Sequence, residues 1–265
     1  MKIAVAGKGG VGKTFVSSTL SRLLARDGYN VLAVDADPNL NLAMGLGIPA
    51  EVADGIVPLS ENEALVKERT GVSTEESYAP IFNMTPRVND IVDRFGVEAP
   101  DGVKLLVMGT VRGGGTGCMC GANALLRVLL QHMLIQRGEV LVMDMVAGLE
   151  HLGRGTARRM DAMLVVLEPR MKSVDTIRRI MRLAEEIEVK EVLAVGNKVA
   201  RPKDREFIQR HMEELGVPVV AVIPYDEAVI DADMAGTPTL DYDADSKAVK
   251  AVDGLKDYLV QRYKP

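Results

Sequence analysis

A glycine-rich stretch near the N-terminus holds the first residues that could do chemistry. Residues 7–14 read Gly-Lys-Gly-Gly-Val-Gly-Lys-Thr and satisfy the pattern G-x-x-x-x-G-K-[ST]. Glycines let successive backbone N–H groups turn toward a phosphate chain, and the helix that follows adds its N-terminal N–H groups and dipole. Lys13 is expected to reach the β- and γ-phosphates, and the Thr14 hydroxyl to hold Mg²⁺. The other expected nucleotide contacts in this stretch are Gly9, Gly10, Val11, Gly12 and Phe15.

Two acidic stretches follow predicted strands. Asp35-Ala36-Asp37-Pro38-Asn39 comes at the carboxyl end of an apolar strand, where open α/β sheets place their ligands. We expect Asp35 to finish this strand and to brace Lys13. The run Val140-Leu141-Val142-Met143-Asp144 also ends in an acid. This is the Walker B arrangement, in which a buried strand delivers a carboxylate to the Mg²⁺ shell.

Cys118 and Cys120 form a second candidate site. They lie in the glycine-rich stretch 113–121, between a predicted strand and a predicted helix. A helix N-terminus lowers the pKa of a thiol and favours the thiolate. One Cys-x-Cys offers only two ligands, but a symmetric dimer with this loop at its two-fold axis would supply four. Four thiolates suit Zn²⁺, Ni²⁺, Cu⁺ or an iron–sulfur cluster. The alternative is two small apolar residues in a turn.

Lys8 is unusual, because an ordinary phosphate loop needs only Lys13. With it, the stretch Lys-Gly-Gly-Val-Gly-Lys-Thr resembles the deviant Walker A motif of the MinD/ParA and nitrogenase iron protein group. The resemblance implies a dimer that sandwiches ATP, with Lys8 reaching the phosphates of the other subunit. A second ammonium there would stabilise charge on the transferring phosphoryl oxygens. The alternative is a solvated loop lysine.

The same resemblance implies roles for residues later in the chain. Asp37 would align the attacking water or touch the Mg²⁺ shell through water, and Gly148 would let a switch loop approach the γ-phosphate. Asn197 would hydrogen-bond the adenine, because its amide offers both a donor and an acceptor. Lys198 beside it is a further nucleotide-binding candidate, and Pro224 lies in a segment that closes over the base. The stretch that starts at Asn197 lacks the Asp of a guanine motif, which favours ATP over GTP.

Three stretches make the resemblance specific to one family within this group. They are the Cys-x-Cys in its glycine-rich loop, the acidic stretch 35–39 and the run Glu150-His151-Leu152-Gly153-Arg154-Gly155-Thr156. A chain with all three is similar to the CooC-type ATPases, which mature the nickel–iron–sulfur centre of carbon monoxide dehydrogenase. The resemblance implies that Cys118 and Cys120 bind nickel or zinc between two subunits, and that ATP and metal both promote dimerisation. Glu150 and His151 are expected to relay the nucleotide state to the interface.

The leading hypothesis is therefore a homodimeric, Mg²⁺-dependent ATPase that converts ATP to ADP and serves carbon monoxide dehydrogenase, its expected client, as a nickel metallochaperone. Two alternatives stay open. One is an electron-transfer ATPase like the nitrogenase iron protein, although the cysteines of that family lie far apart in sequence. The other is a positioning switch of the MinD/ParA kind that acts on a membrane or on DNA, against which the acidic balance and the lack of a basic anchor count.

Predicted strands and predicted helices alternate along the chain and must position these residues. This alternation predicts a doubly wound, mostly parallel α/β sheet flanked by helices. We expect one domain over 1–265, with an insertion at about 49–101 that holds a short helix near Glu61–Glu68. Predicted strands are Lys2–Ala6, Val31–Asp35, Lys104–Met108, Val140–Asp144, Ala162–Leu167, Glu191–Gly196 and Val219–Val222. Predicted helices are Lys13–Asp27, Ala122–Gln136, Ser173–Ile187, Asp204–Glu214 and Asp245–Tyr263.

Composition excludes several classes of protein. The chain has 265 residues, 47% of them hydrophobic, and a net charge of −5, which argues against general nucleic-acid binding. No basic-then-apolar leader and no apolar run of about 20 residues is present, so we expect a cytoplasmic protein without a membrane span. The apolar stripe Val249, Val252, Leu255 and Leu259 of the last helix favours packing on the sheet over a membrane anchor, because its polar face has no basic excess.

Overall fold

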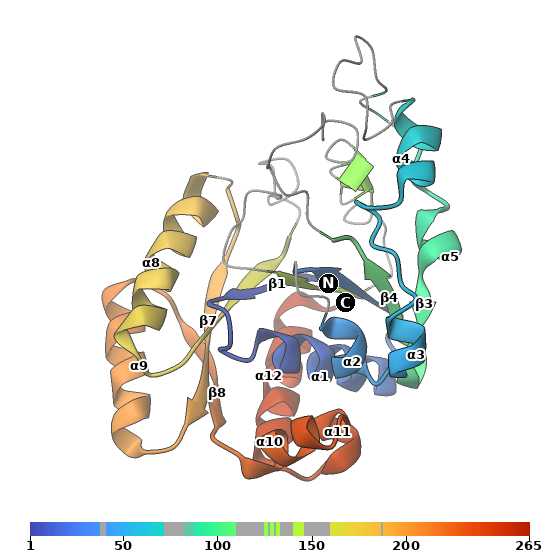
Figure 1. Ribbon diagram of the computed structural model, residues 1–265. Coiled ribbons are helices and arrows are strands. Elements are labelled where there is room, and N and C mark those ends of the chain that lie inside the picture. The colour runs from blue at the N-terminus through green and yellow to red at the C-terminus, as the bar shows by residue number, and fades with distance from the viewer. Residues whose placement is uncertain are drawn as a thin grey trace.

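The described residues of the computed structural model form eight strands in one sheet, in the order β3-β4-β2-β5-β1-β6-β7-β8 (Figure 1). Neighbouring strands are parallel, apart from the antiparallel pair β3 and β4. The structure describes residues 1–37, 41–71, 83, 85, 87–109, 125–126, 128–129, 131–132, 140–145, 160–186 and 188–265. The strands are β1 Lys2–Gly7, β2 Val31–Ala36, β3 Val97–Glu98, β4 Lys104–Val107, β5 Val140–Met145, β6 Ala162–Leu167, β7 Val192–Val199 and β8 Val219–Pro224.

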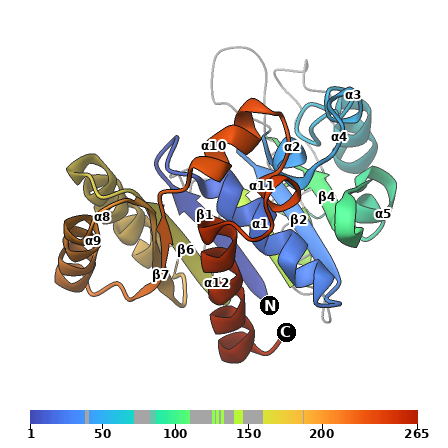
Figure 2. The same ribbon diagram turned by 90° about the horizontal axis from the view of Figure 1, so that it is seen from below.

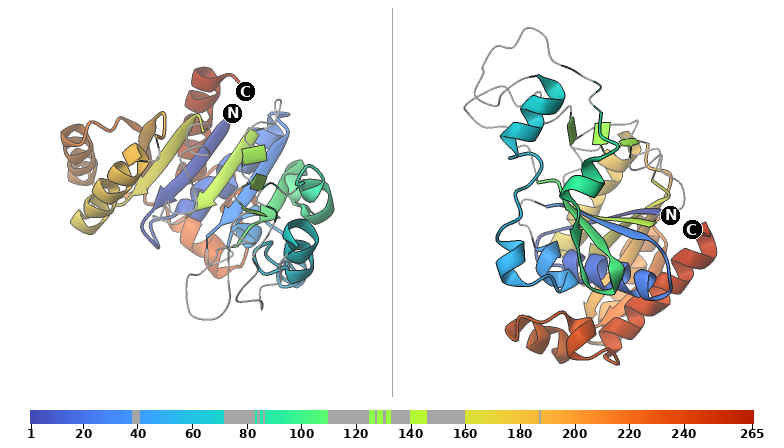
Figure 3. Two further views of the ribbon diagram at one scale, coloured as in Figure 1. Left: turned by 90° about the horizontal axis from the view of Figure 1, so that it is seen from above. Right: turned by 90° about the vertical axis from the view of Figure 1, so that its right-hand side faces the viewer.

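Helices cover both faces of this sheet. On one face α1 (Lys13–Arg26), α2 (Leu42–Leu46) and α12 (Lys247–Tyr263) bury Leu20 and Leu255 in one apolar cluster. On the other, α8 (Met171–Glu186) and α9 (Pro202–Glu214) contribute Ile177 and Ile208 to a second cluster. Seen from below, α1 and α12 lie in front of the strands (Figure 2), and seen from above they lie behind them (Figure 3, left). The predicted doubly wound α/β fold is therefore confirmed.

The central strands are apolar because they are covered twice. Every residue of β1, β2, β5 and β6 is buried, as expected for parallel strands between two helical layers. This burial explains why continuous Val, Leu, Ile and Met runs marked these strands in the sequence. The apolar stripe of the last helix is buried as well, at Val249, Val252, Leu255 and Leu259. The prediction that this helix packs on the sheet is confirmed.

The segment 49–101 holds more structure than its weak periodicity predicted. Besides one short helix, α4 (Glu63–Thr70), it contains α3 (Ala50–Ala53), α5 (Ile91–Phe95) and the edge strand β3. The predicted start at Glu61 was two residues early, because the Asn62 side chain accepts from the Leu65 N–H at 3.0 Å and caps the helix. The 3₁₀ turn η1 (Pro100–Gly102) ends the segment.

Other element boundaries differ from the predictions for local reasons. Helix α12 begins at Lys247 because the Ser246 hydroxyl accepts from the Val249 N–H, and α9 begins at Pro202, since proline suits the first helical turn. Helices α10 (Glu227–Met234) and α11 (Thr239–Tyr242) were not predicted. Of the predicted helix 122–136, residues 125, 126, 128, 129, 131 and 132 are described, and they are helical. No helix among the described residues is long and apolar enough to cross a membrane.

A buried arginine ties distant elements to α1. Arg22 is 3% exposed. Its Nε donates to Asp101 Oδ2 at 2.6 Å, and its Nη1 and Nη2 donate to the two carboxylate oxygens of Asp241 at 2.5 and 2.8 Å. Arg26, one turn further along α1, makes longer contacts with the same two acids. The helix that follows the glycine-rich loop is thus fastened to η1 and to α11.

Candidate functional site

The glycine-rich loop connects β1 to α1 at the carboxyl edge of the sheet. Gly10 and Gly12 have φ values of 80° and 94°, a left-handed backbone that favours glycine. Gly12 also has no room for a side chain, since a Cβ there would lie 2.3 Å from the Asn197 amide nitrogen. A Cβ built on Gly9 or Gly10 would meet no described atom within 4 Å. The loop is therefore closely packed on one side and open on the other.

The first turn of α1 points its functional side chains at the ends of β2 and β5. Lys13 is buried, and its Nζ lies 3.6 Å from Asp37 Oδ2. The Thr14 hydroxyl donates to Asp144 Oδ2 at 2.7 Å. The structure thus brings together Lys13, Thr14, Asp37 and Asp144, which lie far apart in sequence. No side-chain cap occupies the N-terminus of α1, which leaves its N–H groups available to a ligand.

Asp144 has the properties of a cation ligand. It is 1% exposed, and its Oδ1 has no hydrogen-bond partner among the described residues. Burial raises the pKa of Asp144 to about 6, against the hydrogen bond from Thr14 and the positive charge of Lys13. A buried carboxylate oxygen without a partner is costly unless a cation meets it. Asp144 and the Thr14 hydroxyl therefore fit the Mg²⁺ that accompanies a nucleotide.

Asp35 braces the backbone instead of Lys13. Its Oδ1 accepts from the Asp37 N–H at 3.0 Å and its Oδ2 from the Leu42 N–H at 3.1 Å. Burial raises the pKa of Asp35 to about 7, against these two hydrogen bonds. The expectation that Asp35 contacts Lys13 is therefore replaced by a different arrangement: Asp37 lies beside the lysine, and Asp35 holds the chain on both sides of residues 38–40.

Asn197 and Lys198, at the end of β7, contact the loop backbone. The Asn197 side-chain amide donates to the Val11 carbonyl at 2.7 Å, and the Lys198 ammonium donates to the Gly10 carbonyl at 2.8 Å. The same ammonium lies 2.7 Å from Glu168 Oε1. Both residues had been predicted to contact the nucleotide, and the structure places both against the phosphate loop. Glu168 is a site residue that was not predicted, although it follows β6 directly, as Asp144 lies at the end of β5.

Lys8 is exposed on the flank of the loop. It borders a hollow of about 320 Å³ between the loop and the start of α8, where Arg170 and Lys172 add positive charge and Glu168 adds negative charge. An exposed ammonium in this position is free to meet a group that lies outside its own chain. Phe15, by contrast, is partly buried against the apolar cluster beneath α1.

Several predicted site residues cannot be compared with the structure. Cys118, Cys120, Gly148, Glu150 and His151 lie outside the described residues. Pro224 is described: it ends β8 beside Val199 of β7. In the part of the chain that the structure describes, no group of three or more His, Cys, Asp or Glu side chains could hold a metal ion.

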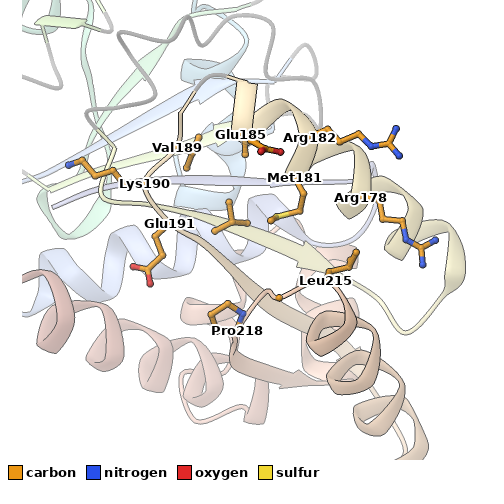
Figure 4. Close-up of a pocket in the computed structure, with 12 residues that line it drawn as sticks. Arg178, Met181, Arg182, Glu185, Val189, Lys190, Glu191, Leu215 and Pro218 are labelled. Carbon is orange, nitrogen blue, oxygen red and sulfur yellow. The ribbon is translucent and has the colours of Figure 1, made fainter.

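A larger hollow of about 730 Å³ lies at the other end of β7 (Figure 4). It lies between α8, the start of β7 and the turn before β8, and Met181, Val189 and Leu215 supply apolar surface. Arg178, Arg182 and Lys190 lie at its edge with Glu185 and Glu191. Because β7 begins here and reaches the phosphate loop only at Asn197, this hollow is separate from the candidate site.

The sequence of this chain is similar to those of known nucleotide-binding proteins. The family model described as CobQ/CobB/MinD/ParA nucleotide binding domain matches residues 2–240. The chain is 44% identical to an uncharacterized ATP-binding protein of Methanocaldococcus jannaschii, with 98% of each chain covered. It is 43% identical to the carbon monoxide dehydrogenase accessory protein CooC of Rhodospirillum rubrum, over 91% of this chain and 90% of that one.

Solved structures agree on the fold. The septum site-determining protein MinD of Pyrococcus horikoshii, complexed with Mg-ADP, superposes with a TM-score of 0.66 at 21% identity. The match covers 97% of this chain and 95% of that chain. The loop, the helix and the buried acids described above thus belong to a fold that is shared with P-loop nucleotide-binding proteins.

Proposed function

The chain belongs to the CobQ/CobB/MinD/ParA family of nucleotide-binding ATPases, and we propose that within this family it is an accessory ATPase that matures carbon monoxide dehydrogenase in the cytoplasm. One observation carries the proposal: the 43% identity to CooC extends over 91% of the chain. An alignment of this length spans the positions of the cysteine pair and of residues 150–156, whereas the phosphate loop alone would indicate only the superfamily.

The proposed reaction is hydrolysis of ATP to ADP and phosphate. The loop N–H groups and Lys13 bind the phosphates, and Asp37, 3.6 Å from Lys13, orients the attacking water. Asp144 and Thr14 would hold Mg²⁺, which would neutralise charge on the phosphate oxygens. The orphaned Oδ1 of Asp144 supports this assignment. Gly148 and Pro224 complete the nucleotide site in the proposal, next to the γ-phosphate and the base.

The proposed cargo is nickel, with zinc as a competing ion. Each chain offers Cys118 and Cys120, and two chains together would provide a tetrahedral or square-planar thiolate site. The proposal therefore requires a homodimer for the metal as well as for ATP. Closure of the dimer over ATP would change the metal site, which would couple hydrolysis to uptake or release of the ion.

The cysteine pair gives the first test. The double variant Cys118→Ser and Cys120→Ser should lose stoichiometric nickel and zinc binding in elemental analysis, because no other cysteine is present in the chain. ATP binding should remain, since the phosphate loop is unchanged. Met119→Ala is the matched control, because it changes the same stretch and leaves both thiols. Undiminished metal binding in the double variant would contradict the cargo site.

The client gives the second test. Nickel-free carbon monoxide dehydrogenase should gain activity when it is mixed with the nickel-loaded protein, Mg²⁺ and ATP, and should gain less when ATP is omitted. The same preparation distinguishes the electron-transfer alternative: a brown protein with stoichiometric iron and sulfide would overturn the nickel proposal.

A further inference from the structure

We propose that Glu168, acting through Lys198, is a positioning residue that keeps the phosphate loop in its binding conformation. The feature behind this inference is the row of contacts between the ends of β6 and β7 and the loop. Glu168 Oε1 lies 2.7 Å from Lys198 Nζ, and Lys198 Nζ donates to the Gly10 carbonyl at 2.8 Å. The inference needs only nucleotide binding by this family, and not the proposed metal cargo or client.

The loop has little internal support of its own. Between Gly7 and Gly12 the one backbone hydrogen bond given by the described residues is a long one, from the Val11 N–H to the Lys8 carbonyl at 3.4 Å. The short bonds come from β7: Asn197 donates to the Val11 carbonyl at 2.7 Å, and Lys198 donates to the Gly10 carbonyl. The end of β7 therefore supports the loop from outside.

Holding these two carbonyls also directs the next two N–H groups. In a trans peptide the N–H points opposite to the C=O of the preceding residue. The Gly10 and Val11 carbonyls point toward β7, so the N–H groups of Val11 and Gly12 point away from it. Successive N–H groups on one side of a loop form a concave anion site. The contact from Asn197 thus directs the Gly12 N–H away from β7, where a phosphate could accept from it, whereas the Val11 N–H also makes the long contact with the Lys8 carbonyl.

Lys198 is itself held in an uncommon conformation. Its φ is 56°, which a lysine rarely adopts. Its N–H donates to the Asn197 side-chain oxygen at 2.9 Å, and its ammonium lies between Gly10 and Glu168. The Glu168 side chain is 13% exposed and the Lys198 side chain 46% exposed, so solvent screens the attraction between the two charges only in part. Removal of this charge should loosen the contact between Lys198 and the loop.

Two variants test the inference by nucleotide affinity. Lys198→Ala should weaken Mg²⁺-ATP binding about tenfold, as expected for the loss of one charge-assisted hydrogen bond. Glu168→Gln should weaken it in the same direction by a smaller factor. KM should rise with little change in kcat, because the loop N–H groups bind the ground state and the transition state alike. In the double variant the effects should not multiply, since Glu168 acts through Lys198.

The choice of ligand distinguishes positioning of the phosphate loop from recognition of the base, and a control variant distinguishes it from general damage to the fold. Binding of ATP, GTP and tripolyphosphate should weaken by the same factor, because the loop contacts only phosphates. Lys190→Ala is the control: Lys190 Nζ pairs with Asp161 at 3.8 Å at the opposite ends of the same two strands, and its loss should leave affinity unchanged. A loss confined to ATP, or unchanged affinity in folded Glu168→Gln and Lys198→Ala, would overturn the inference.

Discussion

Asp144 combines its proposed role as a Mg²⁺ ligand with a cost in stability. It lies beside Asp35 in the register of β2 and β5, and burial raises the pKa values of the two carboxyls to about 6 and about 7. The folded protein therefore binds more protons than the unfolded chain between the ordinary Asp pKa, near 4, and these raised values. It follows that the contribution of these groups to stability is greatest at low pH and decreases as the pH rises through this window.

The variant Asp144→Asn tests whether ionisation of the buried carboxyl lowers stability. Without ligand, its free energy of unfolding relative to wild type should increase by about 2 kcal/mol from pH 4.5 to pH 7.5, because the amide does not ionise. Urea unfolding at both pH values measures the difference, and any constant cost of the amide cancels. Mg²⁺-dependent hydrolysis should be lost at both.

Glu206→Gln is the control for this variant, since Glu206 is exposed in α9. It removes one negative charge without changing a buried site. A stability difference between Asp144→Asn and wild type that stays constant with pH would contradict the buried-charge argument.

For single residues, the position in the site could be predicted from the sequence, but the side-chain contacts could not. The prediction that Lys13, Thr14 and Asp144 lie close together followed from the sequence, because a glycine-rich loop before a helix and the carboxyl ends of parallel strands meet at one edge of the sheet. Asn197 and Lys198 are predicted to contact the nucleotide, and the structure places their side chains on the Val11 and Gly10 carbonyls. Which carbonyl a strand-end side chain meets depends on the neighbouring strand and on a left-handed φ, and neither leaves a pattern in the sequence.

At the scale of elements, Arg22 fastens three parts of the chain that are far apart in sequence. It joins α1 to η1 and to α11 by hydrogen bonds to Asp101 and Asp241. Because α1 carries Lys13 and Thr14 at its other end, this clamp also anchors the helix that presents the phosphate site. Burial makes its removal expensive, since two carboxylates would lose their main partner.

Arg22→Ala should therefore lower the free energy of unfolding by about 2–3 kcal/mol, as expected for lost hydrogen bonds to carboxylates that keep access to solvent. Arg26→Ala removes an arginine that contacts the same two acids from a side chain 39% exposed, and it should cost under about 1 kcal/mol. Denaturant unfolding of both variants measures the two losses of unfolding free energy. Equal losses would show that burial of Arg22 is not what matters.

Elements were predictable where one physical cause dominated. Buried parallel strands read as continuous apolar runs, and amphipathic helices as apolar stripes, so the sheet and its main helices followed from the sequence. The edge strand β3 has two residues, Val97 and Glu98, which is too short for any periodicity. Helix α10 depends on the Asp226 cap, which also accepts from the Ala248 N–H of α12, and such a tertiary contact is not visible in local sequence.

For the whole molecule, the proposed ATP site and metal site are each incomplete in one chain. Lys8 is exposed on the flank of its own phosphate loop, and Cys118 and Cys120 supply two ligands of the four that a closed thiolate site needs. A two-fold dimer would supply both the second lysine of the ATP site and the two missing thiolates of the metal site. The proposed dimer therefore accounts for an exposed lysine in a catalytic motif and for a cysteine pair without further ligands.

Lys8→Ala tests this dimer directly. Because the Lys8 side chain is exposed, the variant should fold and unfold as wild type does. Its ATP-dependent dimerisation in sedimentation velocity should weaken, and hydrolysis should fall by about a hundredfold, the effect of removing one preorganised donor from a transition state. Lys172→Ala is the matched control, because Lys172 is an exposed lysine in the same hollow. If both variants lose activity equally, the effect belongs to the positive charge of this surface; if Lys8→Ala keeps full activity, the loop works within one chain and the composite ATP site is wrong.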